Sequence, residues 1–154
     1  MTTVSTTIEI TNLSYNLDGS KEFAVFLTSV LGSLQLCHWY ADNYNVHQII
    51  GDLYKDLNKV FDKVQEEIIE ITKSGSCGFT MQPPTISPKD LLLYKCSPES
   101  KISEIYKILD LISNVFNSQD LKNFIGSSVN GINNYKEEIL SICNRTKYLL
   151  NMVN

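Results

Sequence analysis

The chain has 154 residues, 43% of them hydrophobic, which predicts a single globular domain over residues 1–154 with a packed core. A net charge of −4, an isoelectric point near 5.1 and no lysine or arginine before Lys21 argue against nucleic-acid binding. No apolar run is long enough to cross a bilayer, and the first twenty residues lack the basic start and apolar core of a secretory leader. We therefore expect no membrane partner and a cytoplasmic location.

The first 19 residues are rich in threonine, serine and β-branched residues, a composition that helix interiors disfavour. We expect an extended N-terminal arm that packs on a neighbouring subunit, with a loosely ordered terminus as the alternative. The bundle then begins with a first long helix over 21–41, for which Ser20 is the N-cap. Its predicted inward stripe is Phe23, Phe26, Leu27, Val30, Leu31, Leu34, Cys37 and Tyr40.

A short polar turn over 42–45 separates this helix from a second one, predicted over 46–73 and ended by Ser74 and Gly75. The apolar residues of the second helix recur at steps of three and four, which is the pattern of one buried stripe. They are Val46, Ile49, Ile50, Leu53, Leu57, Val60, Phe61, Val64, Ile68 and Ile71.

The next segment, 76–97, contains several prolines and is predicted to be irregular apart from a short helix over 88–95. A third helix is predicted over 99–116 and a fourth over 119–152, with a kink between Gly126 and Gly131. A connection this long is expected where the middle crossover of a four-helix bundle joins parallel helices. The sequence therefore predicts an all-α four-helix bundle. The predicted stripes of the last two helices are Ile102, Ile105, Tyr106, Leu109, Ile112, Val115 and Phe116, then Leu121, Phe124, Ile125, Val129, Ile132, Ile139, Ile142, Leu149 and Leu150.

A candidate metal site lies around the second helix. His38 and His47 flank the polar turn, and Asp62 and Glu66 lie one helical turn apart, so that their carboxylates can converge on one ion. His47 and Asp62 share one side of the helix but are roughly 22 Å apart along it. One ion can therefore contact both only if two copies pack antiparallel across a two-fold axis. Two imidazoles facing two carboxylates suit iron or zinc better than calcium or magnesium.

Asp42 and Asp52 are further candidate ligands, although a plain turn cap is the preferred explanation of Asp42. Trp39 is expected to pack beside the site. The alternative interpretation is that the histidines and carboxylates keep an inherited pattern without a working site.

The order His38-Trp39, a second histidine, then an aspartate fifteen residues and a glutamate nineteen residues after it resembles the Dps-type mini-ferritins. The nine-residue spacing of the histidines is more similar to phage and large-virus ferritin-like proteins related to Dps. The resemblance covers 23–71, and more loosely 118–153. It implies a ferritin-like bundle, a short helix in the crossover at the two-fold interface, and an iron-oxidation site shared by two subunits.

One departure from the family concerns Gly51, since Dps proteins usually carry an acid four residues after the second histidine. Asp52 is adjacent but points about 100° away. A one-metal site, or no metal site, is therefore an alternative to a two-iron site.

Two functions follow from the resemblance. One is a mini-ferritin that binds ferrous iron through His38 and His47 of one subunit and Asp62 and Glu66 of its partner, oxidises it and stores it. The other is a non-enzymatic structural protein of a virus or phage particle, with other virion proteins as partners. Whether the chain is an enzyme stays open at this point.

The four cysteines, Cys37, Cys77, Cys96 and Cys143, form no C-x-x-C pair. We interpret them as reduced thiols in a cytosol-like compartment, with a Cys77–Cys96 disulfide as the alternative.

Overall fold

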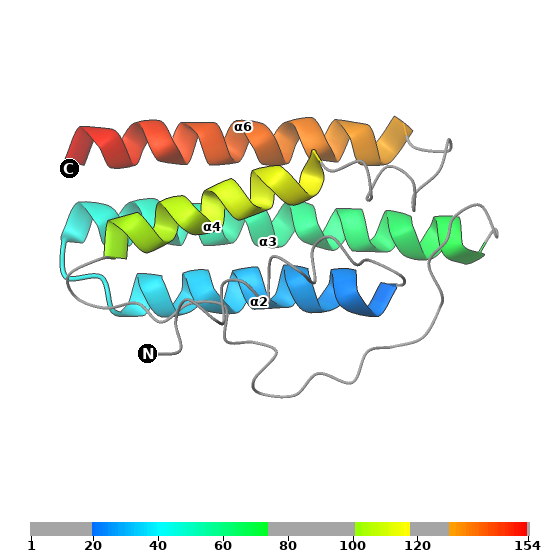
Figure 1. Cartoon of the computed structure of the whole chain (residues 1–154), viewed down its shortest axis with the longest axis horizontal. Helices are drawn as coiled ribbons and strands as arrows, with labels where there is room; N and C mark the ends of the chain where they lie inside the picture. The colour runs from blue at the N-terminus through cyan, green and yellow to red at the C-terminus, as the bar shows by residue number, and fades with distance from the viewer. Residues whose placement is uncertain (1–19, 74–100, 118–129, 154) are drawn as a thin grey trace.

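The computed structural model describes residues 20–73, 101–117 and 130–153. Within these ranges the chain forms four helices and no strand, which confirms the predicted all-α bundle. The helices are α2 (Ser20–Trp39), α3 (Tyr44–Lys73), α4 (Lys101–Phe116) and α6 (Asn130–Val153) (Figure 1). None of the described helices is both long and apolar enough to cross a bilayer.

Helix α3 is the longest described element and packs extensively against both α2 and α6, whereas α4 packs mainly against α6 and only lightly against α2. Figure 1 shows α2 and α3 running in opposite directions from the tight turn that joins them. The C-terminus of α6 lies at the same end of the bundle as this turn.

Where α2 meets α3, each helix boundary lies two residues before the predicted one, at 39 rather than 41 and at 44 rather than 46. Helix α2 ends at Trp39 and α3 begins at Tyr44, so the turn lies slightly earlier than expected. The side chain of Asn43 explains the start of α3. Its Oδ1 atom accepts hydrogen bonds from the backbone N–H groups of Asn45 at 2.8 Å and Val46 at 3.2 Å. Asn43 is therefore the N-cap of α3.

Three predictions lie outside the described residues: the N-terminal arm, the short helix over 88–95, and residues 119–129 of the fourth helix with most of its kink region. They stay predictions.

The core confirms the stripe predicted for the second helix, whose described members are all buried except the half-buried Ile49. Two other predictions are wrong. Tyr40 is 67% exposed because α2 has already ended, and Leu149 is 37% exposed because its neighbour Leu150 takes the core position. Buried residues of the other three helices that belong to no predicted stripe include Val25, Ile108, Leu111, Cys143 and Thr146.

A cluster of phenylalanines joins segments far apart in the sequence. The ring of Phe116 from α4 lies 5.9 Å from that of Phe23 in an edge-on arrangement and 6.0 Å from that of Phe61 in a stacked one. Both arrangements are favourable for aromatic rings beyond the area that they bury. This cluster therefore fixes α2, α3 and α4 at the end of the bundle away from the α2–α3 turn.

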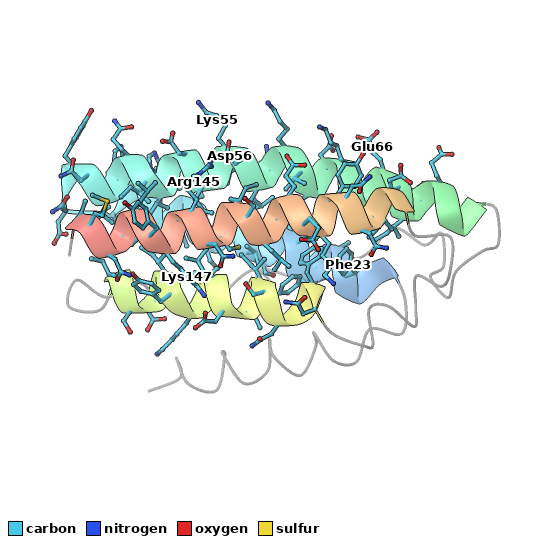
Figure 2. All side chains as sticks on the ribbon, turned by 90° about the horizontal axis from the view of Figure 1, so that it is seen from above. Phe23, Lys55, Asp56, Glu66, Arg145 and Lys147 are labelled. Carbon is cyan, nitrogen blue, oxygen red and sulfur yellow. The ribbon has the colours of Figure 1, made fainter. Side chains whose placement is uncertain are left out.

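Polar contacts along α6 align it with its neighbours. Arg145 pairs with Asp56 of α3 at 2.7 Å, and Lys147 pairs with Asp110 of α4 at 2.5 Å. Figure 2 shows Arg145 beside Asp56, between α6 and α3. The Tyr106 hydroxyl contacts the Asn151 side chain at 2.8 Å. Helix α3 lies between α2 and α6, and its outer face is exposed to solvent.

Candidate metal centre

The two histidines form a reciprocal clamp across the α2–α3 turn. His38 Nδ1 lies 2.9 Å from the backbone oxygen of His47, and His47 Nδ1 lies 2.7 Å from the backbone oxygen of His38. The imidazole rings stack with their centroids 3.9 Å apart and their planes inclined by 18°. A carbonyl oxygen can only accept a hydrogen bond, so each Nδ1 must carry a hydrogen. In the neutral rings the lone pairs are therefore on the two Nε2 atoms.

Gly51 is required by this clamp. A Cβ atom at position 51 would lie 2.8 Å from Cε1 and 3.1 Å from Nδ1 of the His38 ring. The ring is held by its hydrogen bond to His47, so it cannot move aside without losing that bond. The space that an acidic side chain would enter is therefore filled by His38.

The hydrogen bonds of the clamp match those of histidines that bind metals. Such histidines nearly always donate their second ring N–H to a carbonyl or carboxylate, which fixes the tautomer and the ring orientation. Here both Nδ1 atoms donate to backbone carbonyls, and both rings are half-buried. The histidines thus fit a nitrogen-ligand role through Nε2.

Asp62 and Glu66 form the second half of the candidate site, on the outer face of α3. When protonated, the Glu66 carboxyl donates a hydrogen bond to Asp62, and this bond together with the negative charge of Asp62 raises the pKa of Glu66 above its ordinary value. The two carboxyls therefore lie close together, as the four-residue spacing predicted. Both are exposed, above an open surface hollow of 790 Å³ that is also lined by lysines. Figure 2 shows Glu66 and Lys55 pointing away from the bundle on this face of α3.

The two halves do not meet within one chain. Among the residues that the structure describes, no group of three or more histidine, cysteine, aspartate or glutamate side chains could hold a metal ion. The other candidate ligands, Asp42 and Asp52, are exposed. Trp39 is 61% exposed and lies outside the core of its own chain. A complete site from these residues requires a second copy.

The cysteines differ from the sequence-based interpretation in one respect. Cys37, next to His38, is disulfide-bonded, so the expectation of reduced thiols is wrong for this residue, and its partner lies outside the described part of the chain. Cys143 is free, and burial raises the pKa of its thiol to about 12. Cys143 is therefore protonated and unreactive at neutral pH.

The role of Gly51 and the buried side-chain oxygen of Gln65 were missed from the sequence. For Gly51, the available signal was a glycine inside an otherwise regular helix, four residues after a histidine. Nothing in the sequence distinguished Gln65 from the other polar residues of α3.

Comparisons with models of protein families, with curated proteins and with solved structures found no match to this chain.

Proposed function

We propose that two copies of this protein bind ferrous iron at two equivalent sites across a two-fold axis, in the manner of a Dps-like mini-ferritin. The observation that carries the proposal is the reciprocal histidine clamp. It occupies both Nδ1 atoms and leaves both Nε2 lone pairs as nitrogen ligands in a fixed orientation.

Each residue has a distinct part in this proposal. His38 and His47 of one copy supply neutral nitrogen ligands. Asp62 and Glu66 of the second copy supply oxygen ligands, and a bound cation relieves the mutual repulsion of their carboxylates. Because His38 fills the space at Gly51, each site has too few acids for two irons, and we propose one iron per site. Zinc accepts the same ligands and is the expected competitor.

The reaction proposed for this site is the oxidation of Fe(II) to Fe(III), with molecular oxygen or peroxide as the acceptor of the electron. The carboxylates stabilise the additional positive charge of the product. The oxidised iron is then stored or removed.

A second candidate is a non-enzymatic structural protein, such as a component of a virus particle. The specific observation in its favour is again the clamp, because two hydrogen bonds and a stacked ring pair give both histidines a structural role without any metal.

Anaerobic Fe(II) titration with light scattering on the same sample tests the first proposal. We expect saturation near one iron per chain in a sample of paired copies, and loss of binding in the Asp62→Ala/Glu66→Ala variant. The matched control is Glu137→Ala/Glu138→Ala, which removes two exposed carboxylates from α6 and should leave binding intact.

Complementation tests whether the site is shared between copies. A His47→Ala variant and the Asp62→Ala/Glu66→Ala variant should each fail to bind iron alone. Refolded together in equal amounts, they should regain about one quarter of wild-type binding, because half of the pairs are mixed and each mixed pair has one intact site. No iron binding by the wild type supports the structural protein instead, whereas iron binding by the wild type without recovery in the mixture rejects a site shared between copies.

A further inference from the structure

The two imidazole rings of the clamp cannot bind the same metal ion while they are stacked. Their centroids are 3.9 Å apart, and their planes are inclined by only 18°. The Nε2 lone pair of an imidazole lies in the plane of its ring, and a zinc–imidazole bond is about 2.0–2.1 Å long. Lone pairs in two nearly parallel planes at this separation do not meet at one point. The clamp therefore orients each Nε2 atom separately, and one ring must move before His38 and His47 can share an ion.

His38 is the ring that can leave with the smaller loss. Its Nδ1 donates to the backbone oxygen of His47, which lies inside α3, where the N–H of Gly51 is the helical partner of the same oxygen. That oxygen therefore stays paired when His38 leaves. The backbone oxygen of His38 lies in the last turn of α2, where a helix leaves its carbonyls without partners, so the bond from His47 Nδ1 serves as a cap.

The contact with Gly51 belongs to the stacked position of His38 alone. A Cβ atom at position 51 would lie 2.8 Å from Cε1 of this ring, closer than two carbon atoms pack. An added methyl group would therefore disfavour the stacked ring and leave a ring that has moved away unaffected. Position 51 thus allows the balance between the two positions of His38 to be changed without altering either histidine.

We propose that the clamp is the closed, metal-free state of a latch. One divalent metal ion that binds Nε2 of both histidines moves His38 off Gly51 and breaks its bond to the His47 carbonyl, while His47 keeps its bond to the His38 carbonyl. The inference rests on the proposed function for the choice of ligands, and it does not depend on the pairing of two copies. A hydrogen bond and a stacked ring pair together favour the closed state roughly five- to one-hundredfold. The affinity for the ion is lowered by the same factor, because only the open state uses both rings.

Nitrogen-15 NMR of the imidazole rings tests the latch in the wild type, with Zn²⁺ as the probe. Without zinc, we expect both Nδ1–H hydrogens to exchange slowly with water, since both are hydrogen-bonded. At saturating zinc, both Nε2 resonances should shift and the Nδ1–H of His38 should exchange rapidly, whereas that of His47 should stay protected. The variants His38→Gln and His47→Gln assign the resonances. A shift of only one Nε2 resonance, or of both with both hydrogens still protected, overturns the proposal.

The Gly51→Ala variant tests the latch by zinc affinity. Because the methyl group crowds only the closed position of His38, we expect the zinc dissociation constant to fall about tenfold, with helix content unchanged by circular dichroism. The matched control is Gly32→Ala, which makes the same substitution in α2 away from the clamp and should leave zinc affinity unchanged. An equal or weaker affinity of a folded Gly51→Ala variant overturns the proposal, and the NMR experiment does not depend on this variant.

The outcomes separate the latch from the proposed function. Saturable iron binding and successful complementation, with both Nδ1–H hydrogens protected in zinc, overturn the latch alone. Opening of the clamp by zinc without any binding of iron supports the latch and rejects the iron site. Nε2 resonances that zinc leaves unchanged remove both histidines as ligands and overturn both.

Discussion

At the scale of single residues, the contact between Gly51 and His38 carries the most information. A glycine inside a helix is usually less stable than alanine by about 0.5–1 kcal/mol. Here the added methyl group would meet the His38 ring, which its hydrogen bond to the His47 carbonyl and its stacking on the His47 ring hold in place. We expect Gly51→Ala to lower the free energy of unfolding by about 1–3 kcal/mol, as overpacking does elsewhere.

A double-mutant cycle checks the cause. In a His38→Ala background the ring is absent, and Gly51→Ala should instead raise the free energy of unfolding by roughly 0.5–1 kcal/mol, the ordinary gain in helix propensity. Both energies come from urea denaturation followed by circular dichroism. Equal effects of Gly51→Ala in the two backgrounds would contradict the proposed packing.

At the scale of elements, the carboxyl pair on α3 gives a prediction about pH. Asp62 raises the pKa of Glu66 in the folded protein, so the folded state holds this proton more tightly than the unfolded state. The favourable contribution is present at low pH and is lost as the pH rises through the raised pKa of Glu66. We expect Asp62→Asn to return the pKa of Glu66 towards its ordinary value, measured by carbon-13 NMR of the carboxyl group.

The same variant lacks this contribution, so its stability relative to the wild type should be lower at low pH than at neutral pH, where the two wild-type carboxylates repel each other. The matched variant Asp110→Asn lies on another helix and should leave the Glu66 titration unchanged. A Glu66 titration that is the same with and without Asp62 would show that the two carboxyls do not interact.

The attachment of α6 allows apolar and charged contacts to be compared. Ile139 is fully buried, and we expect Ile139→Ala to cost about 2–5 kcal/mol of unfolding free energy. Arg145 pairs with Asp56 at 2.7 Å, but both side chains are substantially exposed, so Arg145→Met should cost less than about 1 kcal/mol. Urea denaturation measures both. A larger loss for Arg145→Met would mean that ion pairs, rather than core packing, hold α6 in place.

At the scale of the whole molecule, the disulfide of Cys37 should contribute to global stability. Removing a native disulfide from a small domain typically costs about 2–5 kcal/mol. We expect dithiothreitol to lower the melting temperature of the wild type, because Cys37 is disulfide-bonded, and Cys37→Ser to have a lower melting temperature than the wild type without any reductant. Non-reducing peptide mapping provides the independent check, and recovery of Cys37 as a free thiol would contradict the bond.

The sequence by itself determined the helices, because the apolar period of three and four fixes both the element type and its buried face. It predicted α3 and its core stripe closely, and it also predicted that Asp62 and Glu66 would be close, since a four-residue spacing on a helix brings side chains together. Tyr40 and Leu149 were placed wrongly because the period alone does not say where a helix ends or which of two adjacent leucines faces inward.

Only the tertiary structure decided what happens where α2 meets α3. The stacking of His38 on His47, their reciprocal bonds to backbone carbonyls and the need for Gly51 all depend on how the two helices approach each other across the turn. Local periodicity contains no information about that approach. The same holds for the hollow between α2 and α3 that Gln65 helps to line, because a cavity is the space left between packed helices rather than a property of either helix.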